Sequence, residues 1–487
     1  MVSSSKSLAV SDSIPVTLNT SAVDTDMLLG FAIHQLQKVG TRVPDDVKSR
    51  LEAWVGDQLD SGTQSLHFFM AFFEHWRAGQ YTMALESLHR YFDYSLASRS
   101  GTDNMRVYYQ YALLHLSVLH SDFECWDESI DAMNECIATA RENQDAACLN
   151  FALSWLLYLR HAHPDKNHSS YSTVSGVVGS NAGERDEVQF LKTKAREGRH
   201  WMLLSSTLLE EARLEMFSDG SLGRAHEHIV QAMYLNIQHD LRSLAPAAVI
   251  FQSSSLDRLG QSHLANRGYE LATTVHMAHC PLNDKVRSAC RRAYTQSQAG
   301  LFSKAISVLE SIASEVSGVL KLDQKVKAYA AIVQSRRRMH HGDNDAADYY
   351  IGQLRPLRTT SDPEIVFEVN ILEIELLIKQ KQLERALSKT NARLAEFKGR
   401  GTVDIAQRLH LLILKSRIFG HGGQASKGFA IALRATSAAE RHLIIPVFLE
   451  GLGVLGRILI DLSEFAMAKN VLESALPRLS AKLKRAN

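Results

Sequence analysis

The sequence predicts an all-α protein, built as a solenoid of stacked helical hairpins with a period of about 40 residues. Apolar residues recur at helical spacing along almost the whole chain, and runs that alternate like a β-strand are nearly absent. Only nine of the 487 residues are proline, so long helices meet few breaks. A small residue also returns at the start of a second helix, and from Ala225 onward its spacing stays near 40 residues. Together these observations favour a repeat architecture over a single globular core.

One hairpin can be identified directly from the letters. In "YQYALLHLSVLH" the residues Leu113 and Leu116 fall on one helical face, and in "DESIDAMNECIATA" Ile130, Met133 and Ile137 fall on another. The intervening "SDFECW" is long enough only for a tight turn. The segment therefore predicts two antiparallel helices.

The hairpin recurs with a fixed internal register. The small residue that opens its second helix is Ala84, Ser129, Ala225, Ala265, Ala305, Ala347, Ala386, Gly428 and Ala468 in turn. A glycine stands five residues before it at Gly79, Gly260, Gly300, Gly342 and Gly423. Glycine can adopt the positive φ that ends a helix, and alanine lets two helices approach closely. This is the tetratricopeptide pattern, with units longer than the usual period of about 34 residues. A HEAT-like array is the alternative, and the glycine-to-alanine spacing favours the tetratricopeptide.

The chain divides into three parts. Residues 1–24 are rich in Ser, Thr and Val without a helical stripe, and we expect them to be disordered. Residues 25–66 are interpreted as the remnant of an N-terminal helical domain, and residues 67–487 as the repeat array. Residues 165–183 form a polar loop inserted in one repeat, between "CLNFALSWLLYLRHA" and a second helix that begins near Glu184. A neutral insertion is favoured over a binding element for this loop.

Charge and hydropathy argue against two classes of partner. Lys plus Arg number 54 against 53 Asp plus Glu, so the chain as a whole does not attract phosphate backbones or anionic lipid. "SRRRMHH" at 335–341 is the best candidate for a local basic patch, but a solvated helix end is favoured. The most apolar stretch is interrupted by Glu450 and Arg457, and the N-terminus lacks a signal-peptide core. We expect a soluble intracellular protein that binds neither nucleic acid nor membrane.

The stretch "LHSDFECWDESIDAMNEC" raises the question of a metal site. A zinc ion needs about four converging ligands, and helical pairs supply them at i, i+3 or i, i+4. The separation of eleven positions from Cys125 to Cys136 does not match helical ligand spacing, and His120 ends the preceding helix. Cys136 occupies a position where other repeats carry a small buried residue, so packing is favoured strongly over metal binding. The five cysteines include no C-x-x-C pair and are expected to be reduced thiols.

Catalytic signatures are missing as well. The sequence contains no phosphate-binding loop, no dinucleotide fingerprint, no H-E-x-x-H and no nucleophile elbow. We therefore expect no catalytic, cofactor-binding or metal-binding residue, no cofactor and no small-molecule substrate. Binding residues are not identified by the sequence. The aromatic residues Phe68, Phe72 and Phe73 are candidates for an exposed contact, although packing within the first repeat is favoured.

The run from Leu88 to about residue 162 resembles subunit 5 of the anaphase-promoting complex. The residues that carry the resemblance are Leu88 to Asp93 in "LHRYFD", Tyr111 to Leu113, Leu119 with His120, and Leu153 to Leu156 in "LSWL". Beyond residue 185 the similarity rests mainly on the number and spacing of repeats. The family usually has a longer helical domain before this run and a further repeat at the C-terminus. The short ends are expected to reflect a truncated gene model or a divergent short form.

The resemblance implies a non-catalytic scaffold subunit of a nuclear cullin–RING ubiquitin ligase that acts on cell-cycle regulators in mitosis. In that family the subunit contributes to a platform with subunits 1, 4 and 15. Two alternatives come from other classes of protein. A free-standing tetratricopeptide adaptor would carry a regular set of inward-facing Lys, Arg and Asn, which the sequence does not show. An enzyme on a helical scaffold is disfavoured by the missing motifs.

Overall fold

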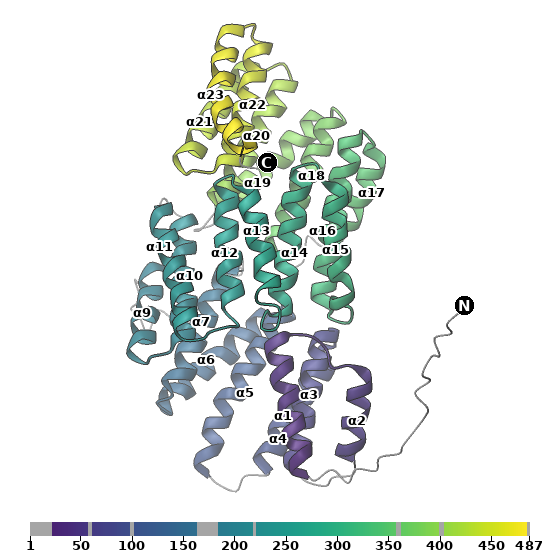
Figure 1. The fold of residues 1–487 in the computed structure, drawn as a ribbon, viewed down its shortest axis with the longest axis vertical. Helices are drawn as coiled ribbons and strands as arrows, with labels where there is room; N and C mark the ends of the chain where they lie inside the picture. The colour runs from purple at the N-terminus through teal and green to yellow at the C-terminus, as the bar shows by residue number, and fades with distance from the viewer. Residues whose placement is uncertain are drawn as a thin grey trace, which may run out of the picture.

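The computed structural model describes residues 22–56, 61–97, 102–162, 184–217, 221–356, 362–398 and 404–484. Within these residues the chain is helical, with 22 α-helices and no strand (Figure 1). The all-α prediction is confirmed. None of these helices combines the length and the apolar character that crossing a membrane requires.

The described helices form ten antiparallel hairpins, preceded by α1 (Ala22–Val39) and α2 (Asp45–Gly56). The hairpins are α3 (Ser61–Ala78) with α4 (Tyr81–Ala97), α5 (Thr102–Asp122) with α6 (Trp126–Glu142), α7 (Ala146–Ala162) with α9 (Glu184–Glu197), α10 (Trp201–Phe217) with α11 (Leu222–Gln238), α12 (Ala245–Arg258) with α13 (Ser262–Thr274), α14 (Leu282–Gln298) with α15 (Phe302–Val316), α16 (Leu320–His341) with α17 (Asn344–Leu354), α18 (Pro363–Lys379) with α19 (Leu383–Lys398), α20 (Ile405–His421) with α21 (Ala425–Arg441), and α22 (Ile445–Asp461) with α23 (Phe465–Lys484).

The predicted register of the hairpins is confirmed residue by residue. Every small residue predicted to open a second helix is buried there, and most have no accessible surface at all. All five glycines that precede them have φ between 73° and 82°. At Gly79 a β-carbon would also lie 2.4 Å from a methyl carbon of Leu320. Glycine is needed at that turn both for its backbone conformation and for the close approach of another helix.

Three further turns of the same kind contain no glycine. Glu124, Lys381 and Ser463 each stand five residues before the small residue, with φ of 65°, 61° and 67°. In each case the backbone amide donates to a carbonyl three residues earlier, as it does at the glycines. The hairpin therefore imposes the left-handed conformation at all eight of these turns, with or without a glycine.

Lys381→Gly is expected to stabilise the protein by about 0.5–1 kcal/mol, because glycine removes the steric cost of positive φ while adding some unfolded-state entropy. The Lys381 side chain is exposed, so little else changes. Lys381→Ala is the control, since it deletes the same side chain but keeps a β-carbon. Urea denaturation should order the variants as glycine above alanine, with alanine near the parent. Equal stability of the two variants would contradict the strain at this turn.

The N-terminal helices share a core with the first hairpin. Leu29, Ile33 and Leu36 of α1 are buried in one apolar cluster with Met70 and Phe72 of α3. The first hairpin begins at Ser61, six residues before the predicted boundary at 67, and α1 begins at Ala22. The rest of the N-terminal segment predicted to be disordered, and the 165–183 loop, lie outside the described residues. The helices on either side of that loop, α7 and α9, end and begin where the sequence places them.

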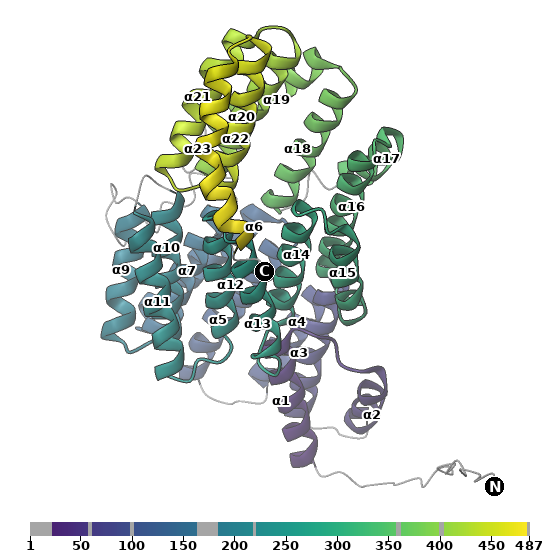
Figure 2. The same ribbon diagram turned by 45° about the horizontal axis from the view of Figure 1, so that its top comes forward.

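The hairpins wind into a superhelix whose first turn closes on itself. In Figures 1 and 2 the N-terminal helices lie below the starts of α14 and α16, which are about 200 residues later in the chain. The Lys321 ammonium lies 2.7 Å from a carboxylate oxygen of Asp122 and also donates to the Asp122 carbonyl. Higher up, Arg258 of α12 donates to Asp404 at 2.7 Å. These contacts join helices that lie far apart in the sequence.

Candidate interaction surface

The first helices of successive hairpins line the inner face of the superhelix. α12, α14, α16, α18, α20 and α22 pack against one another in sequence, whereas the second helices pack mainly against first helices. Helices on the inside of a curved stack are closer to one another than helices on the outside. The contacts between successive first helices therefore place them on the inner face. Side chains that project from the first helices therefore determine what the inner face can bind.

The middle of the inner face is sealed by ion pairs. Arg291 of α14 lies 3.0 Å from Glu364 of α18, and Arg336 of α16 lies 2.7 Å from Glu368 of the same helix. The hydroxyl of Tyr294 donates to Glu368 at 2.8 Å, and the Arg336 guanidinium stands 4.9 Å from the centre of the Tyr294 ring. Burial, followed by the nearby Glu368 charge, raises the pKa of Tyr294. Charges here hold neighbouring repeats together instead of facing a ligand.

Helix α7, in the N-terminal half of the chain, presents aromatic side chains on this face. Phe151 and Tyr158 of α7 are 47% and 50% exposed, and half-buried Trp155 lies between them on the same helical face, its ring 5.2 Å from that of Tyr158. Burial raises the pKa of Tyr158 although half of its surface is accessible. Its electrostatic neighbours include Arg287 of α14, so it projects into the enclosed first turn of the superhelix. Aromatic residues exposed in a concavity are candidate anchors for a protein partner.

A cavity of about 190 Å³ opens between α20 and α22 at the C-terminal end of the inner face. Arg417 and His421 border it from α20, and Glu450, Arg457 and Asp461 from α22. Arg417 reaches Glu450 at 3.7 Å. Partial burial, then Arg457 and Arg417, lower the pKa of His421, and Asp461 opposes them more weakly. The charged neighbours of His421 therefore give a net positive field.

The sequence pattern did not predict this group of charged residues, because the group is not repeated in every unit. Arg417 and Arg457 occupy the same position in consecutive first helices, 40 residues apart, as do His421 and Asp461. Reading the sequence in register at that period would have placed the two arginines side by side.

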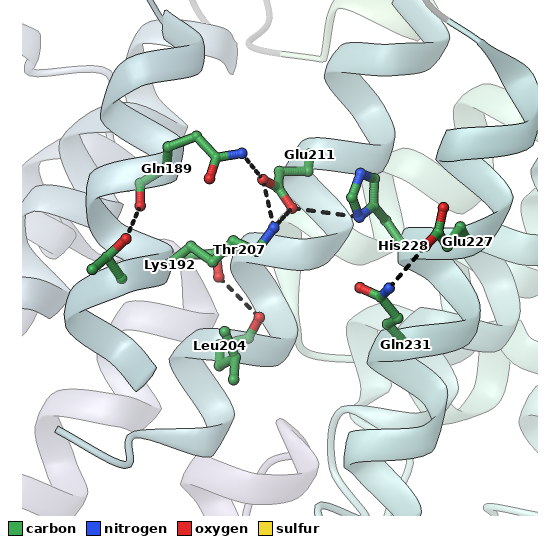
Figure 3. Close-up of polar contacts among 9 residues, drawn as sticks. Gln189, Lys192, Leu204, Thr207, Glu211, Glu227, His228 and Gln231 are labelled. Carbon is green, nitrogen blue, oxygen red and sulfur yellow. Dashed lines mark hydrogen bonds and ion pairs between the residues drawn. The ribbon is translucent and has the colours of Figure 1, made fainter. Parts of the chain in front are cut away.

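A second polar cluster, shown in Figure 3, joins three helices that follow the loop. The buried carboxylate of Glu211 on α10 accepts from the Lys192 ammonium of α9 at 2.6 and 2.9 Å and from Gln189. His228 of α11 lies 3.5 Å from the same carboxylate. Because the Glu211 charge is met by an ion pair and hydrogen bonds, the cluster serves to fix α9 against the next hairpin.

His120, Cys125 and Cys136 do not converge. The His120 ring accepts or donates a hydrogen bond with the Tyr81 hydroxyl at 2.9 Å, and Cys125 precedes α6. Cys136 is fully buried, with its sulfur 3.8 Å from that of Cys148, which agrees with a packing role. Across the described ranges, no three His, Cys, Asp or Glu side chains are grouped as metal ligands would be.

The other candidate segments are also explained by packing. Phe72 and Phe73 are buried, and half-buried Phe68 stacks near Tyr94 with ring centres 5.2 Å apart, so the exposed interpretation is wrong. In "SRRRMHH" the hydroxyl-bearing Ser335 is fully buried and Arg336 is held by Glu368, as described above.

Comparison with known proteins shows which family the chain is similar to. The model of the family described as anaphase-promoting complex subunit 5 matches residues 68–163. A Schizosaccharomyces pombe protein named anaphase-promoting complex subunit 5 is 25% identical over 475 residues, which cover 96% of this chain and 60% of the relative. The Rattus norvegicus protein of the same name is 27% identical over 36% of this chain and 26% of its own length.

The chain thus spans 60% of the length of the S. pombe relative and a smaller share of the rat protein. Among solved structures, human IFIT1 in a dimer with m7Gppp-AAAA aligns over 96% of both chains at 11% identity, with a TM-score of 0.40. The matched residues 68–163 contain the run on which the sequence resemblance rests, and the S. pombe alignment extends it along nearly the whole chain. The resemblance is therefore confirmed: the chain is similar to anaphase-promoting complex subunit 5, over residues 68–163 by the family model and over 96% of its length by the S. pombe alignment.

Proposed function

We propose that this chain is a non-catalytic scaffold subunit of an anaphase-promoting complex. It would assemble with other subunits of that complex and act through its surface. The observation that carries the proposal is the match of residues 68–163 to the subunit 5 family, in a chain whose repeats continue in the same register through α23. Stacked hairpins give long, rigid faces that can hold several partners at once.

The finer proposal concerns the assembly itself. The chain would form a platform with subunits 1, 4 and 15, in a nuclear cullin–RING ubiquitin ligase that modifies cell-cycle regulators during mitosis. The ligase chemistry would belong to other subunits. This chain would contribute the spacing between them, which its closed first turn and its sealed inner face keep fixed.

The aromatic stripe of α7 is the part of the matched region best suited to hold a partner. Leu153 and Leu156 of the "LSWL" element are buried in the hairpin core, whereas Phe151 and Tyr158 remain half exposed. Large aromatic rings that remain half exposed on a folded surface are typical of interface anchors. We therefore expect partner binding to depend on this stripe.

Co-expression with subunits 1, 4 and 15 of the same organism tests this. The parent chain should co-purify with them, and Phe151→Ala with Tyr158→Ala should weaken retention at least tenfold while leaving the circular dichroism melt unchanged. Tyr234→Ala with Tyr349→Ala removes two rings that are 63% and 65% exposed on second helices and should have no effect. Equal retention of the two double variants would show that the α7 stripe is not an anchor. Failure of the parent chain to co-purify would count against the platform.

A further inference from the structure

The cavity between α20 and α22 has the form of a small binding site. One wall is apolar, formed by Val454 with buried Ile458, and the floor includes Gly420. Gly453 lies at its mouth, where an added β-carbon would meet no atom within 4 Å. A glycine in the middle of a helix costs about 0.5–1 kcal/mol relative to alanine, and the space beside this one is free of other atoms.

Two arginines and two carboxylates border the cavity, and the arginines differ in how far they are engaged by acids. Arg457 is exposed, and among the described residues no carboxylate lies within ion-pair distance of it. Glu450 is already shared between Arg417 at 3.7 Å and His410 at 3.6 Å. Asp461 is the other acid at the rim, and at His421 its influence is smaller than that of either arginine. One arginine is thus free, a second is held only at long range, and a histidine completes the group.

We propose that this cavity binds an acidic side chain, glutamate or aspartate, within an extended segment of a partner protein. The carboxylate would accept hydrogen bonds from Arg457 and Arg417, and its aliphatic stem would lie along Val454. A planar guanidinium is well suited to a carboxylate, and the cavity is open to solvent along the inner face, so a chain can enter and leave it. The inference goes beyond membership of a complex and stands on the geometry of α20 and α22 alone.

Binding should change with pH in a defined direction. The two arginines lower the pKa of His421, and Asp461 on the facing helix opposes them. A bound carboxylate brings a negative charge that raises this pKa, so protonation and binding favour each other. Affinity should therefore increase as pH falls through the pKa of His421, which partial burial and the two arginines hold below the ordinary histidine range in the free protein. Between pH 7.5 and pH 5.5 we expect a gain of about two- to fivefold, the size of one added charge at the surface.

Isothermal titration of the full chain with synthetic peptides tests the site. The probe is acetyl-Ala-Leu-Glu-Leu-amide, and its control has glutamine in place of glutamate. The glutamate peptide should bind at least fivefold more tightly, and more tightly at pH 5.5 than at pH 7.5. Equal binding of the two peptides overturns the proposal. A third peptide with glutamine and a free C-terminal carboxylate identifies the source. If it alone binds, the site takes a chain terminus and the proposed source is wrong.

Two pairs of variants locate the binding. Gly453→Leu should fill the cavity and abolish binding, whereas Gly352→Leu places the same side chain at another helical glycine with open space and should leave binding intact. Arg457→Gln should lower affinity about fivefold, a typical effect of losing one exposed ion pair. Arg434→Gln, on the exposed side of α21, should not. Unchanged affinity in both Gly453→Leu and Arg457→Gln overturns the site. Complex membership, tested by co-purification, can stand or fall separately.

Discussion

Arg336→Met is expected to lower the free energy of unfolding by about 3–5 kcal/mol, the usual cost of leaving a buried charge without its partner. The Glu368 side chain is 8% exposed and that of Arg336 13%, so solvent cannot replace the lost ion pair. The Tyr294 hydroxyl would remain as a donor to Glu368, but it carries no compensating charge. Because α14, α16 and α18 meet at this point, the loss should spread over three repeats. Urea denaturation followed by circular dichroism measures it.

Two further variants make that result specific. Arg338→Met removes an arginine from the same helix whose contact with Asp343 is long, at 3.7 Å, and nearly half exposed, so its cost should stay below about 1 kcal/mol. Arg336→Met combined with Glu368→Met removes both charges and should recover much of the stability, since an apolar pair can replace a buried ion pair. A single variant as stable as the parent would contradict the sealed inner face.

Leu309→Ala is expected to cost about 2–5 kcal/mol by opening a cavity between repeats. Leu309 of α15 is 2% exposed and lies in the largest apolar cluster, which runs from α14 to α18. Each hairpin of a solenoid is stabilised mainly by its neighbours, so protection from hydrogen exchange should fall across α14 to α17 and not only in α15. Leu433→Ala, on α21 with half of its surface exposed, is the control and should cost less than about 1 kcal/mol. Loss of protection confined to α15 would argue against coupled repeats.

Sequence periodicity was sufficient for the hairpins and their register, because packing at the small residue and the left-handed turn each demand particular residue types. At Ala305 the residue type itself indicates close helix packing, and at Gly300 it indicates the left-handed turn. Glu124 and Lys381 adopt the same left-handed turn, although neither residue type indicates it. The sequence therefore predicts the turn less clearly at these two positions. Tertiary packing overrides the local preference at those positions.

Contacts between distant repeats could not be predicted in this way. Asp122 and Lys321 pair across 199 residues of sequence, and their proximity depends on the accumulated twist of several hairpins. The cavity lined by Arg417 and Arg457 depends on how two adjacent first helices are spaced. Their common position in the 40-residue register was visible in the sequence, but the open space beside Gly453 was not. The surface of a solenoid depends on the twist and spacing of its helices, which the amino-acid composition does not specify.

Membership of an anaphase-promoting complex is tested most directly by affinity purification of the tagged endogenous protein in moderate salt, followed by mass spectrometry. We expect recovery of a cullin-like subunit, a RING subunit and other helical-repeat proteins in near-equal amounts. Recovery of one small partner, or of none, would contradict the role as a subunit of an anaphase-promoting complex. The first of those outcomes would favour a free-standing adaptor.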